Sequence, residues 1–542
     1  MTSFIFKLFA NYFRRIQRTR LRQMMSGYRN LKVAGRMGSI TAVKQELTAF
    51  KLNLHERHFS SAVMGAGLSR GELVVRQYLL VRIGGISLNK ALLLSAGKPN
   101  SKVVYYMPSA WFGILEKHGF QVDRWRSSVL WGLYVCLLLI YGLIKITNVV
   151  SKYFFKKNSH LQRVKPHAYF ADLELSNLPS SNKQGIGRNI IWWYARWKGK
   201  SSDIEAIHHS VAKSSTNIVG DFELAYQSGP LPDLTSVNEL VRFIMWSVIA
   251  LLISSVDLLR GRWWHAFSLN QAALAAQLRI VPSRLLAKEY FFHNSNWIYR
   301  PLWTYEAEQN GALIYFYFYS TNIRSFNDIN KYLPPPYGWK ASNWPCYLVW
   351  NHYQEKFLRR ATGSQFKVLI VGEIWFNDEE TDTVCISKFR TIAVFDVQPQ
   401  RASIYRLLGL DYEYYIPQVA LPFLEDIQAV LNEFGLDMAI KRKREIGKLA
   451  HPIYRSATKK IELRENVISI SPTISASRVI EKSLAVISMP FTSTALIGVH
   501  QGKPSVYYDA SAKVLRDDYA AHGIPVLIGK DELRAWVRNI LK

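Results

Sequence analysis

The chain of 542 residues lacks most of the short motifs that identify an enzyme class at once. Its three cysteines, at positions 136, 346 and 385, have no metal-ligand spacing and cannot all pair, which fits a reducing compartment. It has no GxxxxGK[ST] loop and no GxGxxG turn, so a P-loop and a standard dinucleotide fingerprint are unsupported. It also has no HExxH, CxxC or Asp-x-Asp pattern. We therefore expect chemistry without a metal ion or other cofactor.

Acidic residues are scarce, with 40 Asp and Glu against 69 Lys and Arg, so the formal net charge is +29. The first acidic residue is Glu46, and ten Lys or Arg precede it. Most of these cations follow an apolar run at residues 4–13, whereas in a signal peptide they come first. Residues 1–165 are thus predicted to be a basic region that lies on an anionic membrane surface, where each cation contributes roughly 1 kcal/mol. A solvated basic tail is the alternative.

Long apolar runs are few and short. Residues 127–144 carry no charge over 18 positions, and residues 243–256 carry none over 14. A spanning helix needs about 20 apolar residues. We predict a peripheral or monotopic protein at the cytoplasmic face of the inner membrane, with these segments dipping into one leaflet. A true span and ordinary core helices are the alternatives.

A hydrophobic content of 49% excludes a disordered chain, and the length allows two or three domains. Strands are predicted in the first half from β-branched and aromatic content. They cover residues 167–173, 188–197, 217–226, 311–320, 346–350 and 366–376, and the last of these is predicted to be a buried strand. The acidic stretch 377–383 is the predicted boundary, which gives a first, acceptor-binding α/β domain over residues 166–380.

Residues 386–542 alternate regularly between strand and helix patterns. The predicted strands are 391–396, 437–441, 466–470, 485–489, 504–508 and 526–528, and Pro422 is placed in the first turn of a helix. Such alternation indicates a parallel, doubly wound sheet whose ligands lie beyond the carboxyl ends of the strands.

The strongest candidate site follows the 485–489 strand. Thr492, Ser493 and Thr494 place three hydroxyls where the next helix begins. A helix N-terminus has free N–H groups and the positive end of the dipole, so it binds anions well. Ordinary N-capping is the alternative interpretation.

Other polar residues follow neighbouring strands. Lys441 and Lys443 come directly after one strand, and Lys448 and His451 lie in the sequence KLAHP. These basic groups would suit a pyrophosphate or a nucleoside monophosphate. The alternatives are a surface turn, which is the more common role of a lone His-Pro pair, and a solvated basic face, which we favour for at least two of the four cations at 441–444. Asp509 could accept a hydrogen bond from a ribose hydroxyl, or it could merely end its strand.

The tract from FDVQP at 395–399 to MPFTSTALIGVHQGKPSVYYD at 489–509 resembles the surface-polysaccharide biosynthesis proteins named for a PFTS motif. More loosely, KLAHP followed by the Ser-Thr turn resembles the nucleotide-binding half of GT-B glycosyltransferases. Sialyltransferase-like and Kdo-transferase-like members hold CMP with a His-Pro and a Ser-Ser/Thr motif. The resemblance implies that His451, Ser493 and Thr494 bind the donor phosphate.

The implied fold is α/β and GT-B-like, with two Rossmann-like domains and N-terminal membrane-associated helices. The implied function is transfer of a sugar from a nucleotide donor, CMP-linked by analogy, to a lipid-linked or growing glycan. The acidic pair followed by Gly that supplies the base in the sialyltransferase-like enzymes is absent here. Glu373 is the first substitute candidate, and Glu306 and His293 are the next.

Three other functions stay open. A polyol-phosphate transferase using CDP-glycerol or CDP-ribitol would share the fold and the basic phosphate site. A non-catalytic assembly protein would use a degenerate donor domain for docking. A nucleic-acid binder is disfavoured, because no binding motif is present and charge gathers near the apolar segments.

Overall fold

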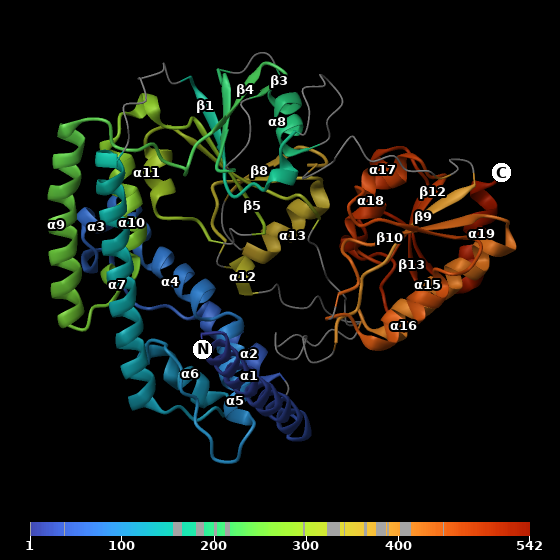
Figure 1. Ribbon diagram of the computed structural model, residues 1–542, viewed down its shortest axis with the longest axis horizontal. Coiled ribbons are helices and arrows are strands. Elements are labelled where there is room, and N and C mark those ends of the chain that lie inside the picture. The colour runs from blue at the N-terminus through green and yellow to red at the C-terminus, as the bar shows by residue number, and fades with distance from the viewer. Residues whose placement is uncertain are drawn as a thin grey trace.

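The computed structural model consists of an N-terminal helical region and two α/β domains (Figure 1). It describes residues 2–36, 38–155, 165–179, 189–199, 203–211, 217–295, 299–321, 337–340, 342–362, 366–375, 386, 390–401, 414–447 and 449–542. The N-terminal helices are α1 (Thr2–Val33), α2 (Ser39–Ala49), α3 (Ser61–Met64), α4 (Gly71–Arg82), α5 (Ile86–Ala96), α6 (Phe112–Lys117) and α7 (Arg124–Phe155).

The first domain is built on an eight-stranded sheet in the order β3-β4-β2-β1-β5-β6-β7-β8. Its strands are β1 (His167–Phe170), β2 (Ala206–His209), β3 (Asn217–Val219), β4 (Phe222–Tyr226), β5 (Glu289–His293), β6 (Leu313–Tyr317), β7 (Cys346–Val349) and β8 (Lys367–Ile370). All pairs are parallel except the β3–β4 hairpin. Its helices are α8 (Ile190–Lys198), α9 (Val237–Leu259), α10 (Trp264–Ile280), α11 (Trp303–Gln309), α12 (Tyr337–Lys340) and α13 (His352–Thr362).

The second domain is an all-parallel six-stranded sheet in the order β11-β10-β9-β12-β13-β14. Its strands are β9 (Thr391–Phe395), β10 (Asp437–Lys441), β11 (Val467–Ile470), β12 (Ala485–Ser488), β13 (Ser505–Asp509) and β14 (Val526–Ile528). Its helices are α15 (Pro417–Glu433), α16 (Pro452–Ile461), α17 (Ala476–Glu481), α18 (Ser493–His500) and α19 (Gly529–Ile540). The central strands β9, β12 and β13 are buried at every position, as covering helices on both faces require. The predicted α/β class with two parallel sheets is confirmed.

Four local predictions are wrong. The segment 217–226 was expected to be one strand but is the antiparallel β3–β4 hairpin, which turns at Gly220 and Asp221. Residues 188–197 were expected to form a strand, but the described residues from Ile190 onward form α8, because Asn189 Oδ1 caps the helix by accepting from the N–H groups of Ile191 and Trp192. Strand β8 is a half-exposed edge strand rather than a buried one. Pro422 lies inside α15, which begins one turn earlier at Pro417. The predicted boundary at 377–383 lies outside the described residues.

The two apolar segments belong to α7 and α9, which pack against α10 at one edge of the molecule (Figure 1). Gly142 of α7 allows close approach, since a Cβ there would lie 2.8 Å from Leu269 Cγ of α10. Among the described residues, α7 and α9 are long and apolar enough to cross a membrane. The bent pair formed by Ser61–Arg82 and Ile86–Ala96 would be a third candidate if it is one span.

Candidate functional site

The hydroxyl turn between β12 and α18 is internally bonded except at Ser493. Thr492 occupies the N-cap position, and its Oγ1 donates to the Met489 carbonyl at 2.9 Å. Thr494 Oγ1 lies 2.8 Å from Ser488 Oγ and 3.1 Å from Thr492 Oγ1. The Ser493 side chain is half-buried and makes no hydrogen bond within the described part of the chain. It is therefore the hydroxyl that can bond an incoming anion without breaking a protein contact.

Two buried tyrosines fix the backbone of this turn. Tyr507 donates its hydroxyl to the Thr492 carbonyl at 2.8 Å, and Tyr415 donates to the Pro490 carbonyl at 3.3 Å. Between them, Phe491 has a φ of +64°, a left-handed conformation that a bulky residue adopts only when its surroundings enforce it. The helix N-terminus is thus held in place before any ligand arrives.

The candidate donor residues lie along one edge of the second sheet. Lys441 ends β10, Asp396 follows β9, the hydroxyl turn follows β12, and Asp509 ends β13. These four strands are neighbours and parallel. Since adjacent strands are about 4.8 Å apart, the ends of β10 and β12 are separated by roughly 10 Å. That span suits a pair of linked phosphates or a phosphate and a sugar.

Lys441 is one of two buried cations at this edge, beside Arg442. Its side chain is almost fully buried, and burial, with a smaller contribution from the nearby charge of Lys443, lowers its pKa to about 8. Lys443 itself is exposed. Of the two predicted lysines, only Lys441 is therefore buried, as we would expect of a cation that pairs with one bound anion.

A buried network beside Lys441 was missed by the sequence analysis. Arg442 donates to Glu462 and, at 3.2 Å, to the hydroxyl of Tyr454, which in turn donates to Asp396. Burial raises the pKa of Asp396, although the charge of Arg442 and the bond from Tyr454 oppose the shift. The only sequence signals were the polar residue that ends the predicted 391–396 strand and the basic run 441–444.

The two predicted residues of KLAHP are placed differently. Lys448 lies outside the described residues. His451 is the N-cap of α16, where Nδ1 accepts the Ile453 N–H at 3.3 Å and the backbone N–H bonds the Pro399 carbonyl. This leaves Nε2 of a half-buried ring for a ligand.

Asp509 is fully buried and fully engaged. Oδ1 accepts from the Tyr414 hydroxyl at 3.0 Å and from the hydroxyl and N–H of Ser511, while Oδ2 accepts the Val514 N–H at 2.8 Å. These bonds shape the loop after β13. The predicted ribose contact would require one of them to be exchanged.

Of the candidate bases, Glu306 faces away from the second domain. It lies on α11, accepts the Ala66 N–H at 2.7 Å and pairs with Arg279 at 3.3 Å. Helix α11 lies in the half of the molecule opposite the second sheet (Figure 1). Glu306 therefore joins the N-terminal helices to the first domain.

Glu373 follows strand β8 of the first sheet, and His293 is the last residue of strand β5. Glu373 Oε2 lies 3.5 Å from Nδ1 of His500, the last residue of α18. Since α18 starts at Ser493, Glu373 lies at the opposite end of this helix, about 10 Å along its axis from the hydroxyl turn. His293 ends the central strand β5, its Nε2 lies 3.4 Å from the Asp172 carbonyl, and burial lowers its pKa. The structure brings neither residue into contact with the donor residues.

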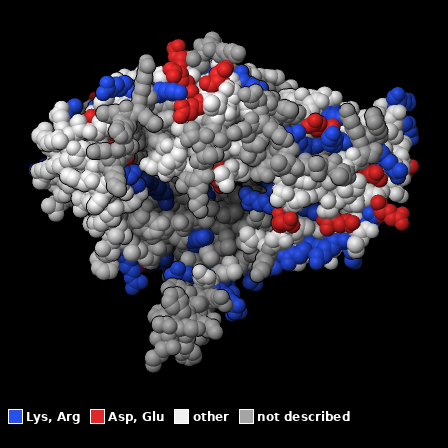
Figure 2. Space-filling view, turned by 45° about the horizontal axis from the view of Figure 1, so that its top comes forward, with Lys and Arg blue, Asp and Glu red and all other residues white. Residues whose placement is uncertain are grey.

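The two domains meet at the end of α18 and at the segment before β14. Besides Glu373 and His500, Asn351 Nδ2 lies 2.9 Å from His522 Nδ1, and Lys356 lies over the ring of Tyr519. The surface is hollowed between the domains, and blue Lys and Arg patches border the hollow (Figure 2).

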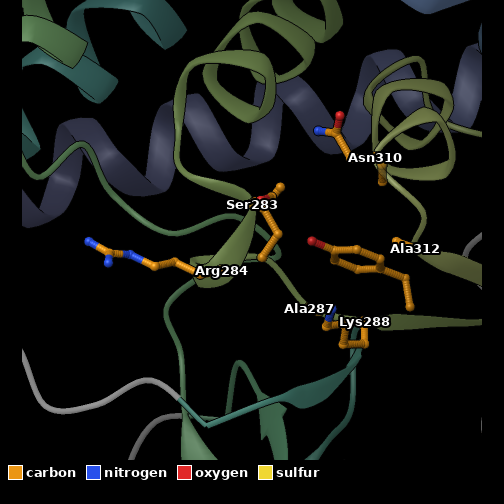
Figure 3. A pocket seen from close by; sticks show the side chains of 9 residues that line it. Ser283, Arg284, Ala287, Lys288, Asn310 and Ala312 are labelled. Atoms are coloured by element: carbon orange, nitrogen blue, oxygen red, sulfur yellow. The ribbon is translucent and has the colours of Figure 1, made fainter.

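Two cavities lie away from these residues. One of about 260 Å³ is lined by Ser283, Arg284, Lys288 and Asn310 among others, at the end of the first sheet where β5 and β6 begin. The Arg284 side chain extends away from it (Figure 3). A second cavity, of about 310 Å³, is lined by residues of the stretch from Lys51 to Arg76. Neither includes a predicted site residue, and no group of three potential metal ligands occurs among the described residues.

Comparison with known proteins gives one family match. A model described as "Polysaccharide biosynthesis PFTS motif protein" matches residues 246–537, which is more than half of the chain. No curated protein matches.

Among solved structures, the wall teichoic acid polymerase TagF is 11% identical, with a TM-score of 0.37 over 76% of this chain and 88% of that one. OtsA in its apo form is 11% identical, with a TM-score of 0.35 over 70% and 91%. The UDP-GlcNAc 2-epimerase from Methanocaldococcus jannaschii is 10% identical, with a TM-score of 0.36 over 70% and 93%. Likenesses this distant carry no argument about activity.

Proposed function

The chain belongs to the polysaccharide biosynthesis PFTS motif family, and on that premise we propose that it is a glycosyltransferase of surface-polysaccharide biosynthesis. The donor would be a nucleotide sugar bound by the second domain. The acceptor would be a lipid-linked or growing glycan bound by the first domain. Capsule and lipopolysaccharide are the polymer classes that this proposal covers.

The observation that carries the proposal is the unengaged Ser493 hydroxyl at a pre-formed helix N-terminus, on the same sheet edge as the buried cation of Lys441. Backbone N–H groups, a hydroxyl and an ammonium are the groups that bind phosphate oxygens. His451 Nε2 would add a donor from the next loop. A CMP-linked sugar is the favoured donor, on the His-Pro analogy.

Catalysis needs a group that takes the proton of the acceptor hydroxyl. We retain His293 for this role, because it ends the central strand of the first sheet and burial lowers its pKa, which keeps the ring neutral. Since Nε2 lies 3.4 Å from the Asp172 carbonyl and Nδ1 accepts the Ser295 N–H at 3.3 Å, proton abstraction would require the latter bond to be exchanged. Glu306 and Glu373 have partners that explain them structurally. Catalysis by His293 would require the second domain to approach the end of β5.

The proposed location is the cytoplasmic face of the inner membrane. The large positive charge and the exposed apolar residues of α7 and α9 support it. Such a location brings a nucleotide donor from the cytoplasm together with an acceptor carried on lipid. Nucleic acid is not a proposed partner.

Nucleotide binding tests the proposal. We expect CMP to raise the melting temperature of the purified protein more than CDP, UDP, GDP or AMP, because a ligand bound only to the folded state adds about 2.7 kcal/mol at a hundredfold excess over Kd. Ser493→Ala should weaken CMP binding by about tenfold to a hundredfold, the value of a hydrogen bond to a charged group, with an unchanged melting temperature in the absence of nucleotide.

Ser456→Ala is the matched control, since this serine is exposed on α16. It should leave CMP affinity unchanged. A preference for CDP would instead favour the polyol-phosphate transferase. If no nucleotide shifts the melting temperature, the donor site is rejected and the docking protein becomes the better hypothesis.

The pH dependence of CMP binding tests Lys441 separately. The pKa of Lys441 is lowered to about 8, so above this pH the free protein loses the cation and CMP affinity should fall, by up to about tenfold per pH unit. Titrations between about pH 7.5 and 9.5 avoid the phosphate's own ionisation near pH 6. Lys441→Arg should flatten the profile because guanidinium stays charged, and a flat wild-type profile would remove Lys441 from the site.

A further inference from the structure

Helices α7 and α9 form a two-helix plate at the outer edge of the molecule (Figure 1). They are antiparallel: Lys152 near the end of α7 lies 3.7 Å from Asp233, just before α9, and Trp131 in the first third of α7 lies 5.0 Å from Trp263, just after α9. Helix α10 packs behind both. Nothing in the described structure covers their outer side.

The outer side of the plate is a continuous apolar face. Its exposed residues recur every three or four positions, which places them on one side of each helix. On α7 they are Val129, Leu133, Leu137, Ile140 and Ile144, and on α9 they are Val241, Met245, Val248, Leu252, Val256 and Leu259. Leu137 is 63% exposed and Leu252 is 61% exposed. A single apolar side chain is often this exposed on a protein surface, but a contiguous patch of so many large apolar side chains is uncommon.

The opposite side of the plate is buried against the rest of the protein. Trp131, Val135 and Gly142 are buried toward α10, and Ser127 accepts the Tyr105 N–H at 3.2 Å. On α9, Ser247 and Ser254 are buried in the same way. Each helix therefore has one face, the exposed apolar one, that can contact a membrane or another molecule.

Charges border the apolar face but do not enter it. Helix α7 has no carboxylate, and the two of α9 are engaged: Glu239 accepts the Thr235 N–H and Asp257 binds His265. Cations lie at both ends, with Arg126 and Arg260 at one and Lys145 and Arg242 at the other. The charge-free stretches are residues 127–144 of α7, about 27 Å long, and residues 243–256 of α9, about 21 Å long, at a rise of about 1.5 Å per residue.

We propose that this face lies in a single membrane leaflet, with both helix axes parallel to the membrane plane; the inference rests on the proposed location at a membrane. The cations at both ends then reach anionic headgroups, and the apolar side chains between them reach the acyl chains. The partner surface is an anionic lipid monolayer.

A spanning orientation conflicts with the rest of the molecule. A bilayer perpendicular to α7 and centred on its apolar stretch would have a hydrocarbon layer about 30 Å thick. Figure 1 places the second domain at the same height as this stretch, so the layer would cut through that domain. Figure 2 shows Lys, Arg, Asp and Glu side chains spread over the second domain, whereas the flank at the outer edge is almost free of them. Charged side chains in hydrocarbon are too costly for that arrangement.

Pairing of two copies through the same face is also disfavoured. A two-fold axis would lay the antiparallel helices of one copy on those of the other and bring cationic ends together at every edge of the contact. Lipid headgroups supply the negative charge that these ends lack.

Labelling of single cysteines from each side of the membrane tests the orientation. Arg126→Cys and Lys152→Cys are made separately in a Cys136→Ser background, and inverted vesicles and spheroplasts of an expression host are treated with an impermeant maleimide. Peptide-level detection identifies the modified thiol. We expect both sites to be modified in inverted vesicles and neither in spheroplasts, because both ends of α7 lie on one side. Modification of the two ends from opposite sides would establish a span and overturn the proposal.

Lipid contact itself is tested by flotation with phosphatidylethanolamine–phosphatidylglycerol vesicles. Leu137→Glu with Leu252→Glu should lower the vesicle-bound fraction at least about a hundredfold, since carboxylates do not enter hydrocarbon. The matched control is Ile218→Glu with Leu463→Glu, which are 74% and 86% exposed elsewhere. Equal loss in both pairs would overturn the assignment.

Native Cys136 gives a reading without a disruptive substitution. It is exposed on α7 between Leu133 and Leu137. Its alkylation by an impermeant maleimide should slow at least about tenfold when vesicles are added, and an unchanged rate would contradict burial in lipid. Nucleotide binding does not enter any of these readouts, so failure of the donor site and failure of the membrane orientation are distinguishable.

Discussion

Glu306→Ala is expected to lower the free energy of unfolding by about 2–3 kcal/mol, because the Ala66 N–H loses its acceptor and the partly exposed Arg279 loses its ion-pair partner. Glu306 is 3% exposed, and its carboxylate accepts the Ala66 N–H and pairs with Arg279. Both partners lose their acceptor in the variant. Burial raises the pKa of Glu306 while these two partners lower it, so the charged form depends on them. Denaturant unfolding followed by far-ultraviolet circular dichroism measures the change.

Glu306→Gln separates this structural role from catalysis. The amide oxygen still accepts the Ala66 N–H, so we expect an intermediate loss of stability. Glu445→Ala, at an exposed carboxylate of the second domain, should change stability by less than about 0.5 kcal/mol. If Glu306→Gln keeps full stability but loses sugar transfer, Glu306 is the base and the structural assignment fails.

Asp509→Ala should lower the free energy of unfolding by about 3 kcal/mol or more, because four donors to a fully buried carboxylate lose their acceptor. Each unsatisfied buried group costs roughly 1–3 kcal/mol, although partial relaxation of the loop after β13 reduces the sum. The measurement is again denaturant unfolding, combined with CMP titration of the folded fraction.

Asp517 provides the matched control for this variant, since it is an exposed carboxylate in the same loop. Asp517→Ala should be nearly neutral. The ribose contact would be favoured instead if Asp509→Asn kept the stability of the wild type and bound CMP more weakly. If Asp509 is structural, Asp509→Asn should instead lose stability, and the protein that remains folded should bind CMP as tightly as the wild type.

The second domain could be predicted from the sequence because its strands are continuous apolar runs bounded by turn residues. The predicted strands 437–441 and 526–528 coincide with β10 and β14. The hydroxyls at 492–494 were predicted to begin a helix, and α18 begins at Ser493. In these segments local propensity and burial point to the same structure.

Long-range contacts could not be predicted in this way. Glu306 lies 240 positions from Ala66, and Asp509 lies 95 from Tyr414. Nothing at either carboxylate's own position signals such a partner. In α8, the aromatic and β-branched residues favoured a strand, but the Asn189 cap and one apolar helical face prevailed. The network of Asp396, Tyr454 and Arg442 likewise forms only when β9 and β10 pair.

Helix α18 carries the hydroxyl turn at its first residue and the interdomain contact of His500 with Glu373 at its last. A helix of eight residues moves as a stiff rod, so a displacement at one end is transmitted to the other. Anion binding at the hydroxyl turn and the contact between the domains therefore both involve helix α18. A substitution that removes the His500–Glu373 contact is expected to change anion affinity at Ser493 only to the extent that this contact differs in free energy between the anion-bound and anion-free protein.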